Sequence, residues 1–322
     1  MSWRAESVLM SNARTSSTET STKTPHLPRQ ACIFSFVLII LSVLSLRPLL
    51  NLAALVLSDP LYSHIPLIPL VSAYLIWLKR HEMATSPGPA TAIPKSVIRW
   101  PAFVPAIPGT VVLIIWFLAK PQWRAEPVNS ASLLVFAYVC FIWAASMAVF
   151  GWDVVRRVLF PLAFLVFMVP FPADLMRQIE SFFQYTSADA ASLLLGISQT
   201  PVLRDGLFFA LPGITLEVAQ ECSGIRSTLV LFITSLVGGY MFFQSKRYRV
   251  IFALAVIPIA ILRNALRIFT IAMLCVHVDP SMIDSPVHRR GGPLFFALSL
   301  IPLFALLFFL YRREHKLRSR TP

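Results

Sequence analysis

Residues 250–273 read VIFALAVIPIAILRNALRIFTIAM, an apolar segment whose only strongly polar side chains are Arg263, Asn264 and Arg267. A helix needs about 20 residues to cross the hydrocarbon core of a bilayer, which is about 30 Å thick. The segment therefore predicts a membrane-spanning helix. At about 1.5 Å per residue, Arg267 lies about 25 Å beyond Val250, close to one membrane surface.

The rest of the chain has the same apolar character. Its 322 residues are 57% hydrophobic and only 13% charged. A soluble domain has about a quarter of its residues charged, so this deficit indicates lipid as the solvent. Apolar segments occur at 32–50, 62–78, 103–119, 131–150, 155–170, 226–243, 250–273 and 294–311. We therefore predict an all-α polytopic membrane protein with about eight transmembrane helices.

The net charge of +13 is unevenly distributed. Basic residues gather at both chain ends and in alternate connections, as at Lys79, Arg156 and Lys246. By the positive-inside rule these parts are cytoplasmic. The excess is thus a topology signal, and no nucleic-acid partner is expected. We expect a cytoplasmic (inner) membrane protein with both termini inside, divided into a disordered tail (1–30), one transmembrane domain (31–312) and a basic tail (313–322).

The outer connection from Phe171 to Glu221 is much longer than the others. Its first part, Glu180–Ile197, has apolar residues at helical spacing and is expected to lie along the membrane interface. In its second part, turn signals alternate with short apolar segments, and Ile214, Leu216 and Val218 alternate with polar residues. This pattern predicts a small extracytoplasmic hairpin that leads directly into Cys222.

Cys222 is the candidate nucleophile. Cys32 and Cys140 lie among aliphatic neighbours, where a thiol behaves as a small hydrophobic group. Cys222 instead precedes the sixth predicted span, where Ser223 would cap the helix and Arg226 would lie one turn along. The helix dipole and the arginine both favour the thiolate, while partial burial opposes it.

Two further groups are predicted at the same outer level as Cys222. Arg263 and Arg267 are charges inside a span, and such charges are costly unless they are paired or functional. A fixed guanidinium is suited to hold a carboxylate or a developing oxyanion. His288 precedes the last span and could act as a base. A nucleophile, a base and an anion stabiliser are what acyl transfer needs.

Other interpretations of these residues remain open. Arg263, Arg267 and His288 could line the anion path of a transporter or channel, and Arg226 could simply reach toward the headgroups. Cys222 could pair with Cys275 in a disulfide, since both are predicted at the outer face. His277 is a second candidate base. A non-enzymatic scaffold is a further alternative. We expect neither a metal site nor a cofactor, because no His, Cys and Asp set has zinc-like spacing.

Four blocks of the chain resemble the exosortase/archaeosortase family of membrane-embedded cysteine transpeptidases. Residues 62–77 are similar to the family's second-span region, and 216–227 (LEVAQECSGIRS) to its nucleophile block. Residues 263–268 (RNALRI) resemble its Asn-x-x-Arg block, and 288–296 (HRRGGPLFF) its last block. The resemblance implies Cys222, Arg267 and His288 as catalytic residues. It implies a set of supporting residues: Ser223, Gly224, Arg226, Ser227, Arg263, Asn264 and Gly292.

The same resemblance implies a substrate and a reaction. The expected partners are secreted proteins that end in a short motif, commonly with Pro-Glu-Pro, followed by one transmembrane helix and a basic tail. Cleavage near the motif would be followed by transfer of the new carboxyl terminus to a lipid or glycan acceptor of the envelope. Release of the product to water, as by a plain intramembrane protease, is the alternative outcome.

Overall fold

The computed structural model describes residues 26–80, 103–218, 224–285 and 291–319. The helices of the first half are α2 (His26–Leu44), α3 (Leu46–Ser58), η1 (Pro60–Tyr62), α4 (Leu67–Leu78), α7 (Ala106–Leu118), α8 (Pro121–Ala125), α9 (Pro127–Phe150), α10 (Trp152–Val155), η2 (Arg156–Val158), α11 (Leu159–Phe164) and η3 (Leu165–Met168). The second half contains α12 (Ala173–Ile197), β1 (Leu203–Asp205), β2 (Phe208–Leu211), β3 (Ile214–Glu217), α13 (Ile225–Phe242), α14 (Lys246–Leu254), α15 (Val256–His277), η5 (Pro280–Asp284) and α17 (Gly292–Arg318).

Every predicted span falls on helical structure, and the chain is an all-α polytopic membrane protein. Five helices in the described residues are long and apolar enough to cross a membrane, or seven if each of two bent pairs counts as one span. The segment predicted at 103–119 contains the shorter apolar helix Ala106–Leu118.

Of the predicted spans, 32–50 is sharply bent, whereas 250–273 has a one-residue interruption and still lies in one candidate span, Lys246–His277. The 32–50 segment bends by 74° between α2 and α3, and the 250–273 segment is interrupted between α14 and α15. The helix before each break ends four residues before a proline, at Leu44 before Pro48 and at Leu254 before Pro258. Proline has no N–H to donate to the carbonyl four residues earlier, and its ring crowds that carbonyl.

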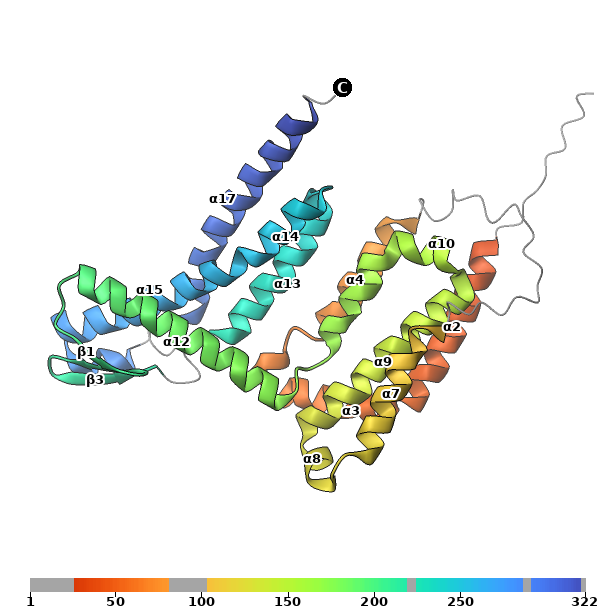
Figure 1. The fold of residues 1–322 in the computed structure, drawn as a ribbon, viewed down its shortest axis with the longest axis horizontal. Coiled ribbons are helices and arrows are strands. Elements are labelled where there is room, and N and C mark those ends of the chain that lie inside the picture. The colour runs from red at the N-terminus through yellow and green to blue at the C-terminus, as the bar shows by residue number, and fades with distance from the viewer. Residues whose placement is uncertain (1–25, 81–102, 219–223, 286–290, 320–322) are drawn as a thin grey trace, which may run out of the picture.

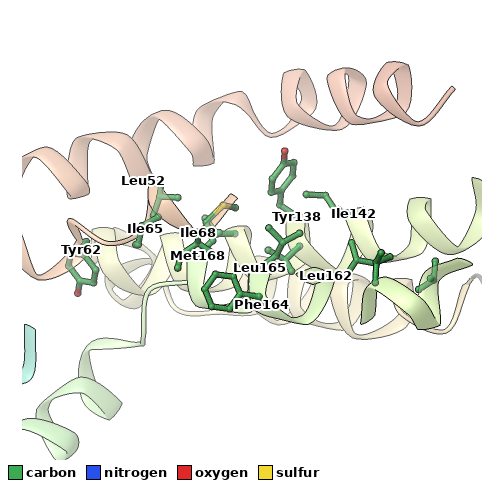
Figure 2. Packing of buried hydrophobic residues seen from close by; sticks show 14 residues of the cluster. Leu52, Tyr62, Ile65, Ile68, Tyr138, Ile142, Leu162, Phe164, Leu165 and Met168 are labelled. Atoms are coloured by element: carbon green, nitrogen blue, oxygen red, sulfur yellow. The ribbon is translucent and has the colours of Figure 1, made fainter. Parts of the chain in front are cut away.

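The first-half helices pack around one apolar core. Side chains from α3, η1, α4, α9, α11 and η3 meet there, including Tyr62, Ile68, Val135 and Phe164, and Figure 2 shows this packing. Ile68 and Val135 are almost fully buried. Because exposed apolar surface of the same helices faces outward, the core and the lipid-facing side are both hydrophobic, as in a membrane bundle.

The second-half helices α13, α14, α15 and α17 form another group (Figure 1), and Phe160 of the first half stacks on Tyr240 of α13 with ring centroids 4.0 Å apart. Leu231, Phe252, Val256 and Leu303 are central to its core. Glu314 of α17 is buried and accepts hydrogen bonds from the backbone N–H groups of Ser245 (2.6 Å) and Gln244 (3.3 Å). A carboxylate at the first turn of α14 satisfies free donors and complements the helix dipole.

The predicted hairpin is a three-stranded antiparallel sheet in the order β1-β2-β3. Its two turns contain Gly206 and Gly213, whose φ angles of +60° and +84° suit glycine. The alternation predicted for β3 is present, since Leu216 is buried while its neighbours Thr215 and Glu217 are exposed. The sheet packs its apolar face on α12 and on the C-terminal part of α15.

Helix α12 links the two helix groups and runs across the ends of α13 and α15 (Figure 1). It turns by 94° from the preceding Trp152–Met168 helices. This bend supports the expectation of an interfacial helix, because a segment perpendicular to a span runs along the membrane surface. Ala188, Ala191 and Leu195 of α12 pack against Ala265, Ile268 and Ala272 of α15, among others. The alanines among these residues allow a close helix–helix approach.

Candidate active site

The predicted site residues divide into two sets. Cys222, Ser223 and His288 lie outside the described residues. Gly224, Arg226, Ser227, Arg263, Asn264, Arg267 and Gly292 are described. Gly224 follows Cys222 by two residues, which an extended chain spans in at most about 7 Å. The surroundings of Gly224 therefore define the neighbourhood of the candidate nucleophile.

Gly224 is the residue that precedes α13, and it has left-handed backbone geometry with φ +67° and ψ 14°. Its carbonyl oxygen accepts hydrogen bonds from the backbone N–H of Thr228 (3.0 Å) and the Thr228 hydroxyl (2.9 Å). The Ser227 hydroxyl (3.0 Å) and Nη2 of Arg263 (3.0 Å) donate to the same oxygen. This set of donors fixes the peptide from which α13 begins.

Arg263 is the deepest cation of the site, with only 6% of its surface exposed. Besides the Gly224 carbonyl, its Nη2 donates to the Thr228 hydroxyl at 3.2 Å. Within the described part of the chain, Nη1 of Arg263 and Nδ2 of the adjacent Asn264 are buried without a hydrogen-bond partner. Buried donors without acceptors are costly. We therefore expect these two atoms to donate to acceptors that the described residues do not include.

The nucleophile block and the Asn-x-x-Arg block interlock at Gly224. A Cβ atom built on Gly224 would lie 2.4 Å from Nη2 of Arg263 and 3.3 Å from Oδ1 of Asn264. Only glycine therefore fits between α13 and α15, for reasons of space as well as backbone angle. Two sequence blocks forty residues apart are thus in direct contact.

The other flank of residues 219–223 is also fixed. The backbone N–H of Val218 donates to the Leu207 carbonyl at 3.0 Å. The Val218 carbonyl accepts a hydrogen bond from Nε2 of Gln184 on α12 at 3.2 Å. Because Val218 and Gly224 are both held by buried side chains, the segment that contains Cys222 starts and ends at defined points.

Arg267 lies one helical turn beyond Arg263 on α15 and is partly buried. The spacing of four residues places both guanidinium groups on one side of α15. Arg226 differs from both, because its side chain is exposed. The site therefore has a positive centre on α15, which favours the binding of an anion or a developing negative charge.

The last helix begins at the same end of the second-half group. α17 starts at Gly292 and its Phe296 packs against the apolar cluster that contains Val256, whereas Glu314 near its other end caps α14. It therefore runs antiparallel to α14 and α15, with its first turn toward the Arg263 end. His288 precedes Gly292 by four residues, which span at most about 14 Å. A Cβ on Gly292 would meet nothing within 4 Å, so no close contact explains this glycine.

The competing residues lie elsewhere. Cys275 is a free, buried thiol on α15, so the alternative disulfide with Cys222 is not formed. His277 is exposed ten residues beyond Arg267, about 15 Å along the helix. No group of three His, Cys, Asp or Glu residues that could hold a metal is present in the described ranges.

Three buried polar residues of α12 were not predicted as part of the site. Glu180, Gln184 and Ser187 are buried. They share one helical face with Ala188 and Ala191, which pack on α15. A sequence pattern could have predicted this buried polar face, since polar residues at i, i+4 and i+7 precede small apolar residues on the same face. The polar part of this face contacts the Val218 carbonyl through Gln184, and the apolar part packs on α15.

The Gly224→Ala variant is expected to unfold more easily than the wild type by about 1–3 kcal/mol, because left-handed geometry disfavours a side chain. The added methyl must also displace the Arg263 guanidinium. Thermal unfolding of the detergent-solubilised protein measures the effect. Gly196→Ala is the matched control, because a Cβ there meets nothing within 4 Å and alanine favours the helix. Equal unfolding temperatures for the two variants would contradict the interlocked geometry.

Comparison with known proteins gives one match. A family model described as "Transmembrane exosortase" matches residues 56–305. No curated protein matches the chain, and no solved structure does. The matched range includes η1 and α4, the sheet, Gly224, Arg267 and the first half of α17.

Proposed function

The chain belongs to the transmembrane exosortase family, and we propose that it is a cysteine transpeptidase that cleaves C-terminal sorting signals of secreted proteins. The observation that carries this proposal is the contact of Gly224 with Arg263 and Asn264. It joins the block that contains the candidate nucleophile to the block that contains Arg267. A thiol beside a buried positive centre is what attack on a carbonyl group requires.

In the proposed substrate, a transmembrane helix follows the sorting motif. A sorting signal of motif, transmembrane helix and basic tail would place its tail in the cytoplasm and its motif at the outer face. The basic ends and connections of this chain predict the same orientation for the enzyme, with the starts of α13 and α17 outside. Enzyme and substrate would then meet at the membrane surface under α12 and the sheet.

The proposed reaction has two acyl-transfer steps. The Cys222 thiolate attacks the scissile carbonyl carbon, and the C–N bond then breaks to leave a thioester. The imidazolium of His288 gives its proton to the departing amine. In the second step the neutral imidazole takes a proton from an acceptor amine or hydroxyl, which attacks the thioester and releases the thiolate. With water as the acceptor, the same steps amount to hydrolysis.

The two arginines of α15 have different proposed roles. Arg267 faces the reacting groups and stabilises the oxyanion of each tetrahedral intermediate, or holds a carboxylate of the motif. Arg263 is a positioning residue, since its hydrogen bonds go to Gly224 and Thr228. Exposed Arg226 would contribute only a distant positive charge. Exclusion of water by α12 would prolong the life of the thioester.

The test is co-expression of the full chain with a secreted protein that ends in a sorting signal of this kind. We expect the tail to be removed only when the chain is present. Mass spectrometry of the processed protein then identifies its new carboxyl terminus. An added mass there supports transfer, whereas a free carboxyl group means that the enzyme is a protease. An intact tail in the presence of the folded chain would overturn the proposal.

A further inference from the structure

A cavity of about 390 Å³ lies where α8, α9 and α12 begin. It is at the same end of the helix bundle as the start of α13, because Phe171, Met176 and Ile225 belong to one apolar cluster. None of the residues in the candidate active site lines it. The cavity therefore needs an explanation of its own.

The charges around this cavity are of both signs. Lys120 and Arg177 contribute two cations, and Glu126 and Asp174 contribute two carboxylates. Asp174 and Arg177 form an ion pair on the surface of α12, and both remain mostly exposed. A lining with balanced charges is poorly matched to a simple anion or a simple cation. It matches a ligand that itself has one positive and one negative group.

One wall of the cavity is polar and buried. Asn129 is only 6% exposed, and its Oδ1 accepts a hydrogen bond from the backbone N–H of Ala173 at 3.1 Å. Its Nδ2 donates to no residue in the described ranges, while the side chain lines the cavity. Two long helices, α9 and α12, also begin here, and the positive ends of their dipoles favour a phosphate.

The flank of the cavity is strongly apolar. Phe117 and Leu118, at the end of α7, are 72% and 76% exposed just before Lys120. Leu175 beside Asp174 is also exposed. Trp123 lines the cavity, at the level where indole rings settle between headgroups and acyl chains. A polar cavity next to exposed apolar helices fits an amphipathic ligand better than a free solute.

We propose that this cavity binds the headgroup of a zwitterionic membrane lipid that has a phosphate and a primary amine. The phosphate contacts Lys120, Asn129 and the starts of α9 and α12. The ammonium group contacts the Glu126 and Asp174 carboxylates, and an acyl chain follows the exposed face of α7. The site is separate from the cysteine chemistry, so this proposal does not rest on the proposed function.

Native mass spectrometry of the delipidated full chain tests the proposal with three lipids of identical acyl chains. We expect phosphatidylethanolamine to bind at least about fivefold more tightly than phosphatidylglycerol, which lacks the amine and would face two carboxylates. Phosphatidylcholine should bind more weakly than phosphatidylethanolamine, since its quaternary ammonium donates no hydrogen bond. Equal binding of the three lipids would overturn the proposal.

Variants locate the binding to the cavity. The isosteric pair Glu126→Gln and Asp174→Asn should remove the preference for phosphatidylethanolamine over phosphatidylglycerol. Asp153→Asn is the matched control, because Asp153 is an exposed acid that pairs with an arginine three residues on, as Asp174 does. Persistence of the preference in the double variant would exclude this site. Displacement of the lipid by equimolar free phosphoethanolamine would show a solute site instead.

Discussion

The Cys222→Ala variant is expected to leave the tail of a co-expressed substrate uncut at every time point. The proposed thioester cannot form without the sulfur, and loss of a nucleophile typically removes about 10⁶-fold in rate. Cys222→Ser should also be inactive, because a neutral serine hydroxyl is a much weaker nucleophile than a thiolate. Immunoblotting of substrate against time measures the loss.

Controls separate this result from damage to the fold. Cys140→Ala and Cys275→Ala should still process the substrate, because both thiols are free and buried away from Gly224. A channel whose arginines line an anion path predicts instead that Cys222→Ser keeps full function. Processing by the serine variant at the wild-type rate would therefore reject a mechanism that depends on the thiol.

Hydropathy was sufficient to predict the spans because lipid imposes one requirement on every segment that crosses it. Backbone groups must be satisfied within a helix and side chains must be apolar, so 131–150 and 226–243 correspond closely to α9 and α13. The bends were missed because hydropathy does not register geometry. The sequence does contain a signal at Pro48 and Pro258, because a proline in an apolar segment predicts a helix break in the preceding turn.

From the sequence, only the membrane level that Cys222, Arg267 and His288 share could be predicted. A rise of about 1.5 Å per residue places Arg267 at the level of Cys222. That rise contains no information on which faces of two helices meet. The contact of Gly224 with Arg263 depends on the left-handed peptide before α13 and on the position of α15, both of which are tertiary features. The part played by Gln184 was hidden for the same reason, since its partner Val218 is thirty-four residues away.

Arg267 is the residue whose role depends most on chemistry beyond charge. Arg263, one turn earlier, already supplies a positive charge to this end of α15, and its hydrogen bonds go to α13. If the site needed only a positive potential, a lysine at position 267 would serve as well as arginine. A planar guanidinium differs because it presents two parallel N–H donors to an oxyanion or a carboxylate.

Arg267→Lys is therefore expected to slow tail removal by about 10²-fold, and Arg267→Met by about 10³-fold, which is the range for loss of an oxyanion donor. The rate of tail removal in membrane vesicles measures the loss. In the Arg267→Lys variant, which keeps the positive charge, alkylation of Cys222 by iodoacetamide should stay within about threefold of the wild type. Arg312→Met, an exposed arginine near the far end of α17, is the control for charge loss. A lysine variant with wild-type rate would show that charge alone suffices, and a parallel loss of alkylation would assign Arg267 to folding of the segment around Cys222.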